Sequence, residues 1–268
     1  GFLDINSWVY GAVFAVLLGV VIIGGIKRIA AVTSRLVPGM AIIYIISAII
    51  ILIVNVQYLP DAIRSIFVGA FSPEGVTGGF LGVLILGFRR AVFSNEAGIG
   101  SAPIAHSAVK TKEPITEGIV SVLEPFIDTV VICTITALVI VTTGVFSAGE
   151  GIEGARMTSE AFGSVLPWFP YILALVAILF AFSTAISWSY YGVKAITFIF
   201  GERKFIELTY KLIFCLFAIV GASLDLTKVI DLSDSSLFLM AIPNLIGVYL
   251  LAGVVKKEFS KYKENYMN

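Results

Sequence analysis

The chain has 268 residues, of which 58% are hydrophobic and only 13% charged, and its formal net charge is zero. A soluble domain carries about 45–50% apolar and about 25% charged residues, so this composition indicates a polytopic membrane protein. The balanced charge gives no basis for nucleic-acid binding. Two cysteines and one histidine provide neither a disulfide framework nor a histidine-rich metal site.

Seven stretches are long and apolar enough to cross a bilayer, which takes about 20 mostly apolar residues. They cover residues 8–25, 38–56, 78–109, 119–143, 168–200, 205–222 and 237–255. We therefore predict an all-α membrane protein with a transmembrane transporter core over residues 1–255 and a basic tail over 256–268. Because the chain starts without Met and opens directly into a membrane segment, we expect it to be the C-terminal part of a longer protein.

Lysine and arginine concentrate in alternate connections between these stretches. By the positive-inside rule, those connections are cytoplasmic. The residues are Lys27, Arg28, Arg35, Lys110, Lys112, Arg203, Lys204, Lys256, Lys257, Lys261 and Lys263. This pattern predicts a multi-pass protein of the cell membrane with a cytoplasmic C-terminus, whose tail contacts anionic membrane lipid.

The connection over residues 146–164 lies on the opposite side of the membrane in this topology. It is rich in glycine and acidic residues. We expect a plain solvated connection, because such residues belong in loops by default. A gating element is the alternative.

The third stretch contains a segment that an ordinary membrane helix would not tolerate, GFRRAVFSNEAGIGSAP at residues 87–103. Gly98 and Gly100 permit φ values that helices do not use. Pro103 removes a backbone donor but suits the first turn of a new helix. The segment therefore predicts a helix broken near residues 93–101, with a second half-helix starting near Ser101. Such backbone is tolerated at membrane depth only where protein buries it or it lines a cavity.

Polar and charged residues accompany this break. Ionisable side chains at membrane depth usually mark a substrate or ion path. Backbone groups freed at a broken helix can bind the carboxylate or ammonium of an amino acid. Phe93 would supply an apolar wall, and Asn95 can both donate and accept hydrogen bonds. We assign structural or coupling roles to Glu96, Arg89 and Arg90. A proline kink packed against neighbouring helices is the bland alternative.

The fourth stretch begins with two carboxylates, Glu124 and Asp128, whose spacing of four places them on one helix face. Asp128 lies about one turn into the stretch, where its oxygens could bind Na⁺ or carry a proton. Thr129, Cys133 and Thr136 form a neighbouring stripe of small residues, which equally suits helix packing.

The fifth stretch carries hydroxyls and an aromatic ring at helical spacing. Ser183 and Ser187 are four residues apart, as are Thr184 and Trp188. Hydroxyl and carbonyl oxygens are sufficient to bind Na⁺, and Trp188 could cover a small substrate. Small-residue packing with an interfacial aromatic explains the same pattern equally well.

Other function classes lack their motifs. The sequence has no phosphate-binding loop ending in Lys-Ser or Lys-Thr, so it predicts no ATP-driven motor. No Ser/His/Asp or Cys/His set is evident, so we expect no enzyme. The filter sequence of potassium channels is absent as well.

Three segments together resemble the alanine or glycine:cation symporter family, the sodium:alanine symporters. They are FSNEAGIGSAPIAH at residues 93–106, PFIDT at 125–129 and CTITAL at 133–138. The resemblance covers essentially the whole chain. It implies a LeuT-type inverted-repeat fold in which the seven stretches correspond to fold helices four to ten.

The resemblance also implies residue roles and a function. The positions that the resemblance implies for substrate are Phe93, Asn95, Gly98, Ile99 and Trp188. For sodium it implies Ser183 and Thr184. The oxygen chemistry described above adds Ser187 and Asp128 as sodium candidates. The implied function is Na⁺-driven uptake of alanine or glycine, without an organic cofactor. The earlier helices, including a partner broken helix, are not in this chain, so we do not expect it to transport alone. A proton-coupled carrier using Glu96 or Asp128, and a channel or receptor on the same helices, are the alternatives.

Overall fold

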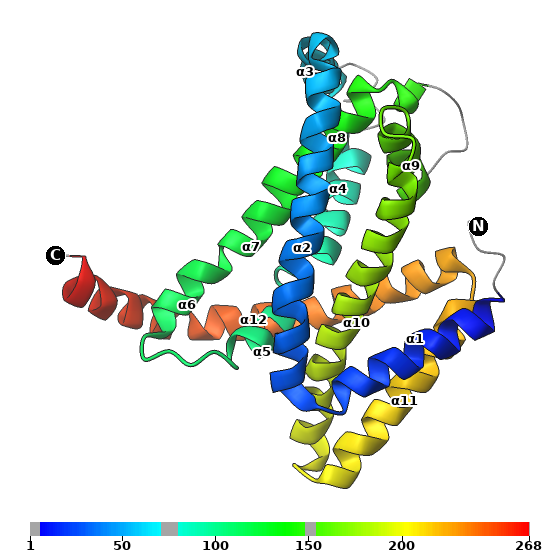
Figure 1. Cartoon of the computed structure of the whole chain (residues 1–268). Coiled ribbons are helices and arrows are strands. Elements are labelled where there is room, and N and C mark those ends of the chain that lie inside the picture. Colours follow the sequence, from blue (N-terminus) through cyan, green and yellow to red (C-terminus); the bar gives the residue numbers. More distant parts are fainter. Residues whose placement is uncertain (1–5, 71–79, 148–153, 268) are drawn as a thin grey trace. The chain divides into compact units, whose positions relative to one another are not determined.

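The computed structural model describes residues 6–70, 80–147 and 154–267, and every regular element in these ranges is helical (Figure 1). The elements are α1 (Ser7–Ile22), α2 (Gly25–Val54), η1 (Val56–Tyr58), α3 (Leu59–Ala70), α4 (Phe80–Asn95), α5 (Ser101–His106), α6 (Pro114–Ser121), α7 (Leu123–Pro125), η3 (Phe126–Cys133), α8 (Thr134–Thr142), η4 (Val145–Ser147), α9 (Ala155–Gly163), α10 (Phe169–Phe200), α11 (Lys204–Ser223) and α12 (Leu226–Tyr266).

Five helical stretches in the described part of the chain are long and apolar enough to cross a membrane. They are Gly25–Val54, Pro114–Thr142, Phe169–Phe200, Lys204–Ser223 and Leu226–Tyr266. The apolar helix α1 and the helix α4 have 16 residues each, about 24 Å at the rise of an α-helix. The start of the predicted third stretch, at residues 78–79, lies outside the described residues. These helices support a multi-pass membrane protein, while the count of seven spans stays a prediction.

Two predicted connections are wrong, because the chain there is helical. Helix α2 starts at Gly25 and includes the basic residues that were placed between the first two stretches. Helix α12 starts at Leu226 and includes Asp231 and Asp234. After Gly25, no glycine or proline interrupts either segment before Pro38 and Pro243, so the local sequence does not force the helix to end there. Helix α12 also continues into the basic tail as far as Tyr266.

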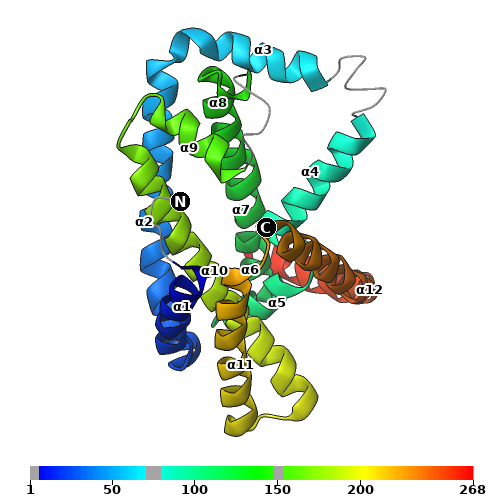
Figure 2. The same ribbon diagram turned by 90° about the vertical axis from the view of Figure 1, so that its right-hand side faces the viewer.

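The chain divides into two compact units, the first covering residues 1–51 and 152–230. Here α1 packs along α11, and both contact α10 (Figures 1 and 2). Close approach of α1 and α11 depends on Gly11, where a Cβ would lie only 3.0 Å from the Cα of Ile219. The core of this unit is apolar and includes the buried residues Leu18, Ile22, Ile29 and Ile186.

Helix α9 lies inside the connection that was predicted to be a plain loop. Its Phe162 is fully buried and stacks on Phe169 of α10, with ring centroids 4.7 Å apart. The ring centroid of Tyr44, on α2, lies 5.2 Å from that of Phe162. The apolar face of α9 explains why this part of the connection is ordered against the helices. Residues 148–153 of the connection lie outside the described residues.

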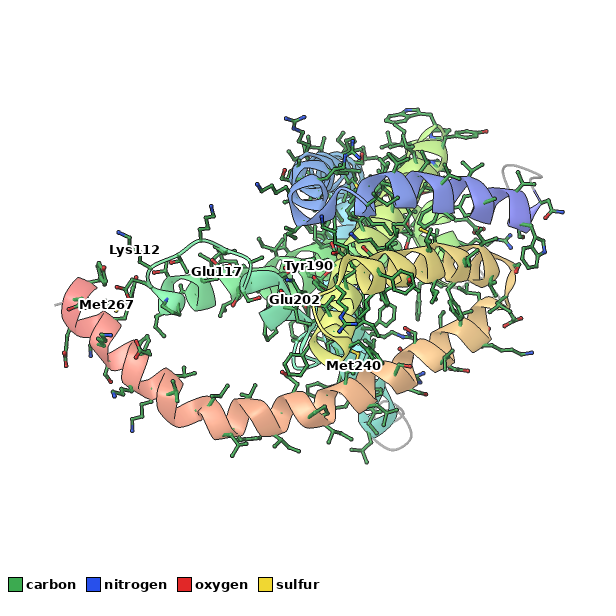
Figure 3. All side chains as sticks on the ribbon, turned by 90° about the horizontal axis from the view of Figure 1, so that it is seen from below. Lys112, Glu117, Tyr190, Glu202, Met240 and Met267 are labelled. Carbon is green, nitrogen blue, oxygen red and sulfur yellow. The ribbon has the colours of Figure 1, made fainter. Side chains whose placement is uncertain are left out.

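The second unit covers residues 52–151 and 231–268. Helix α4 contacts η3, and α3 contacts α8. Figure 3 follows α12 past Met240 to Met267, with side chains projecting all around the helix. Near its end, the Tyr266 hydroxyl donates to a carboxylate oxygen of Glu113 at 3.4 Å. Many large apolar side chains of α12 are exposed, as expected for a helix that meets lipid or other helices.

Candidate substrate and sodium sites

The predicted break near residues 93–101 is confirmed. Helix α4 ends at Asn95, and α5 starts at Ser101. Between them the φ angle is 55° at Glu96, 83° at Gly98 and 96° at Gly100. Glycine accepts these left-handed angles at little cost, whereas a residue with a Cβ rarely does. The regular backbone pairing of a continuous helix is therefore interrupted around residues 96–100, where the Ile99 N–H donates to the Glu96 carbonyl at 3.4 Å.

Two side-chain amides satisfy part of this freed backbone. The Asn95 side-chain oxygen accepts from the backbone N–H of Ala97 at 3.1 Å. The side-chain N–H of Asn244, on α12, donates to the carbonyl of Gly98 at 2.9 Å. Sequence reasoning missed Asn244. The signal was present, since an asparagine in an apolar membrane helix usually hydrogen-bonds across to a neighbour.

The end of α4 is held against the fourth stretch by two adjacent hydrogen bonds. The Ser94 hydroxyl donates to a carboxylate oxygen of Asp128 at 2.6 Å. The Asn95 side-chain N–H donates to the Thr129 hydroxyl at 3.0 Å. The structure thus brings the predicted substrate residue Asn95 and the predicted sodium residue Asp128 to neighbouring positions in one unit.

Asp128 and Thr129 lie in η3, a π-helical segment that spans Phe126–Cys133. Pro125, immediately before it, lacks an N–H and would crowd the carbonyl four residues earlier in an α-helix. A wider turn relieves that crowding. π-Helical turns are rare and frequently occur at functional sites. The sequence predicted a transmembrane helix here but not its wider winding.

The carboxylates of the fourth stretch have different partners. Both Glu124 and Glu117 contact His106 of α5. A carboxylate oxygen of Glu124 lies 3.4 Å from Nε2 of the imidazole, and one of Glu117 lies 2.6 Å from Nδ1. Asp128 instead binds Ser94. The helix face that Glu124 and Asp128 were predicted to share therefore contacts both sides of the break. No cluster of three or more His, Cys, Asp or Glu side chains suited to a metal occurs among the described residues.

Both arginines of α4 are paired with carboxylates of α12. Arg89 donates to Asp234 at 2.5 Å and to Asp231 at 3.4 Å. Arg90 lies 3.8 Å from Asp234. The side chain of Asp234 is only 3% exposed. In its ion pair with Arg89, the carboxylate is therefore buried. The spacing of three between the aspartates, which puts them on one helix face, was the available signal.

The other residues at the break differ in exposure. Phe93 is 44% exposed, whereas Ile99 is 2% exposed. Ile99 therefore offers a site its backbone rather than its side chain. Ser101 is fully buried, and its hydroxyl has no hydrogen-bond partner among the described residues. An unpaired buried hydroxyl is costly, which makes Ser101 an additional candidate ligand that the sequence reading did not name.

In the first unit, α10 carries the predicted hydroxyls on an uninterrupted helix. Ser183 is buried and donates to the carbonyl of Phe180 at 2.9 Å, and Ser187 donates to the carbonyl of Ser183 at 3.1 Å. Thr184 is exposed. Trp188 meets Tyr191 edge-on with ring centroids 5.7 Å apart. Each serine hydroxyl donates its hydrogen bond to a backbone carbonyl of α10, and its oxygen keeps lone pairs that can bind a cation.

Comparison with known families decides the classification. Residues 1–268 match the sodium:alanine symporter family. The chain belongs to that family. Family members are transporters rather than enzymes, which confirms the expectation that this chain is not an enzyme.

Three relatives show the range of this family. The chain is 40% identical over 263 residues to "Sodium/alanine symporter AgcS" of Methanococcus maripaludis, covering 97% of the chain and 58% of the relative. It is 35% identical to "Amino-acid carrier protein AlsT" of Bacillus subtilis, covering 98% of the chain and 56% of the relative. It is 33% identical to "Probable sodium/glutamine symporter GlnT" of the same bacterium, covering 97% and 55%. The chain thus spans a little over half the length of these family members.

Proposed function

We propose that the protein, with its remaining helices, is a secondary active transporter that carries alanine or glycine into the cell together with Na⁺. The broken helix tied to Asp128 and Thr129 is the observation that carries this proposal. It supplies polar backbone and a carboxylate in a chain of a sodium:alanine symporter family. No covalent chemistry and no organic cofactor are needed, and Na⁺ is the coupling ion.

The proposed substrate site in the second unit is the backbone at Gly98 and Ile99 with the side chains of Phe93 and Asn95. An amino acid is a zwitterion, and the carbonyls and amides of a break can pair with both of its charges. Asn95 and Asn244 already hold two of the freed groups in fixed directions. A preorganised site of this kind loses little conformational freedom on binding. Trp188 is proposed as a further substrate contact.

The proposed sodium ligands are oxygens, because hard cations prefer oxygen to nitrogen or sulfur. On α10 they are Ser183, Thr184 and Ser187, and in the second unit the candidate is Asp128. Coupling requires only that Na⁺ favours the substrate-binding states, because a ligand shifts an equilibrium by its differential affinity. Glu96, Arg89 and Arg90 are proposed to shape and couple the break rather than to contact substrate.

We further propose the LeuT-type fold, a cell-membrane location and a cytoplasmic C-terminus. The alternation of basic connections supports this orientation. The facing ends of α1 and α2 line one cavity in the first unit together with the connection between α10 and α11, which agrees with their assignment to one side of the membrane.

The test is uptake of labelled alanine by the full-length protein in proteoliposomes. We expect accumulation when Na⁺ is higher outside than inside, and none when Na⁺ is equal or replaced by choline. Glycine should compete. Equal uptake with and without the Na⁺ gradient would remove the sodium coupling, and conductance without saturation would favour a channel instead.

A proton-coupled carrier is the second candidate, because Asp128 is a carboxylate placed directly against the break. In this case a pH gradient alone should drive uptake. Asp128→Asn should then abolish the response to the pH gradient while leaving alanine exchange between equal pools intact. A variant that still responds to the pH gradient would exclude Asp128 as the proton carrier.

A further inference from the structure

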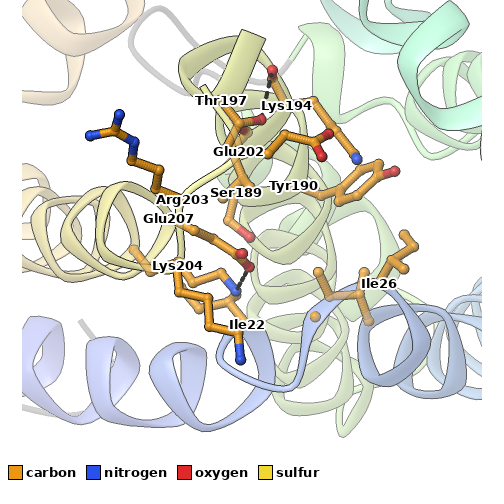
Figure 4. Close-up of a pocket in the computed structure, with 14 residues that line it drawn as sticks. Ile22, Ile26, Ser189, Tyr190, Lys194, Thr197, Glu202, Arg203, Lys204 and Glu207 are labelled. Atoms are coloured by element: carbon orange, nitrogen blue, oxygen red, sulfur yellow. Dashed lines mark hydrogen bonds and ion pairs between the residues drawn. The ribbon is translucent and has the colours of Figure 1, made fainter. Parts of the chain in front are cut away.

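A cavity of about 390 Å³ lies in the first unit, and its lining does not include the predicted hydroxyls of α10. It is formed where α1 turns into α2 and where α10 turns into α11 (Figure 4). Its volume falls in the range of about 300–1,000 Å³ that is typical of small-molecule sites. Sequence reasoning did not predict it.

The lining of this cavity carries an excess of positive charge. Four basic side chains, Lys194, Arg203, Lys204 and Lys211, are set against two acidic ones. Lys211 has a side chain only 7% exposed and pairs with Glu207 at 2.5 Å. Among the described residues, the other three basic groups have no carboxylate within ion-pair distance.

The basic residues come from α10, from its connection to α11 and from α11, and they face the cavity in different ways. Figure 4 shows Lys194 beside Tyr190 and Glu202, and Lys204 directed toward Ile22. The Lys194 ammonium lies 5.7 Å from the centre of the Tyr190 ring. Arg203 points away from the other labelled side chains, so it belongs to the rim. Tyr190 and Glu202 also lie close to each other in the view from below (Figure 3).

One part of the cavity wall is apolar. Ile22 is fully buried, and Ile29 and Val193 are 6% and 8% exposed. Ile26 completes this wall. A cavity lined by both cations and aliphatic groups matches a ligand whose anionic head is joined to a hydrocarbon tail. A purely hydrophilic anion would leave the aliphatic wall unused.

We propose that this cavity binds a phosphate group, and that the headgroup of an anionic phospholipid is the source favoured by its aliphatic wall. Basic pockets between transmembrane helices on the cytoplasmic side bind phospholipid head groups in this way. Arg203 and Lys204 belong to a basic stretch that the positive-inside rule assigns to the cytoplasm. Lys194 and Lys204 are the cations expected to attract the phosphate, because Lys211 is already paired with Glu207.

Native mass spectrometry of the full-length protein in a nonionic detergent tests this proposal. The protein is titrated with phosphatidylglycerol, with phosphatidylcholine of the same chains, and separately with glycerol phosphate. The double variant Lys194→Gln/Lys204→Gln is compared with Arg64→Gln/Lys228→Gln, which removes two exposed basic side chains outside both the cavity and the tail.

We expect phosphatidylglycerol to bind more tightly than phosphatidylcholine, and the cavity variant to weaken phosphatidylglycerol binding about thirtyfold, as two near-surface lysines would. The Arg64→Gln/Lys228→Gln variant should remain close to the parent. Binding of glycerol phosphate that the cavity variant also loses supports a free phosphate compound as the source. Equal phosphatidylglycerol binding by both variants, or no preference over phosphatidylcholine together with no glycerol phosphate binding, overturns the proposal.

Discussion

The break between α4 and α5 and the middle of α10 present polar groups to a ligand in opposite ways. Both place polar groups in segments apolar enough for a membrane. Helix α10 keeps its backbone continuous for 32 residues, so only side-chain hydroxyls are offered to a ligand. At the break the helical backbone pairing is interrupted. Side chains of Asn95 and Asn244 bind the backbone there, and carboxylates of α12 pair with the arginines of α4. A helix can therefore present oxygen cheaply through hydroxyls, whereas presenting backbone requires a surrounding set of supports.

The largest expected effect comes from removing a support of the break. In Asp234→Ala, Arg89 and Arg90 lose their shared buried carboxylate. We expect the free energy of unfolding to fall by about 3 kcal/mol, at the lower end for a broken buried pair because the arginines are partly exposed. Denaturant unfolding of the full-length protein in detergent measures it.

Asp231→Ala is the matched control for that substitution. Asp231 is 68% exposed and meets Arg89 at 3.4 Å, so its loss should cost less than about 1 kcal/mol. Equal effects of the two substitutions would show that the burial of Asp234 does not matter.

Backbone conformation is tested next. Gly98→Ala and Gly100→Ala force a Cβ onto left-handed φ angles of 83° and 96°, which should cost about 1–3 kcal/mol each. The cost should be greater at Gly100, where a Cβ would also lie 3.3 Å from Asn244. Gly247→Ala on α12, where a Cβ meets open space, should not destabilise, because alanine favours helix. Destabilisation at Gly247 equal to that at Gly98 would contradict the special role of the break.

The hydrogen bond between Asn95 and Thr129 should contribute a smaller amount. Asn95→Ala and Thr129→Val are each expected to lower stability by about 1 kcal/mol, with the double variant costing less than the sum because both remove one bond. Only Asn95→Ala should also abolish alanine binding, measured by isothermal titration. Unchanged affinity in a folded Asn95→Ala protein would remove Asn95 from the site.

The smallest effect on stability is expected on α10. Ser183→Ala and Ser187→Ala remove hydroxyls that bond only to their own helix, so stability should change by less than about 0.5 kcal/mol. The Na⁺ concentration for half-maximal alanine uptake should nevertheless rise. Ser260→Ala, whose hydroxyl makes the same kind of bond in the tail, should leave it unchanged. If Ser260→Ala shifts the Na⁺ dependence as far as Ser183→Ala, these hydroxyls are not specific ligands.

The fold was predictable where periodicity and length decide it. The stretches at 168–200 and 205–222 became α10 and α11 almost residue for residue, because Pro170 and Gly201 mark their ends. The break was predictable because Gly98, Gly100 and Pro103 are strong local signals. Connections such as residues 26–37 were mispredicted because charge was taken as the end of a helix, whereas no glycine or proline in this segment ends α2.

The contacts at the site were less predictable than its location. Nothing local in the sequence says that Asn244 reaches Gly98 or that Asp234 pairs with Arg89, since about 145 residues separate each pair and chain topology brings them together. The left-handed Glu96 also had no signal, because glutamate rarely adopts that conformation. The π-helix followed a visible proline, but a proline more often causes a simple kink.

Helix α12 has a consequence for how the break can move. It meets the segment before, at and after the break, through Asp234 with Arg89, Asn244 with Gly98 and Tyr266 with Glu113. These three α12 residues span about 48 Å at the rise of a helix, well beyond the thickness of a hydrocarbon layer. Any rearrangement at Gly98 must therefore displace α12 along with it or exchange one of these contacts. The C-terminal end of α12 is thus mechanically connected to the backbone proposed to hold the amino acid.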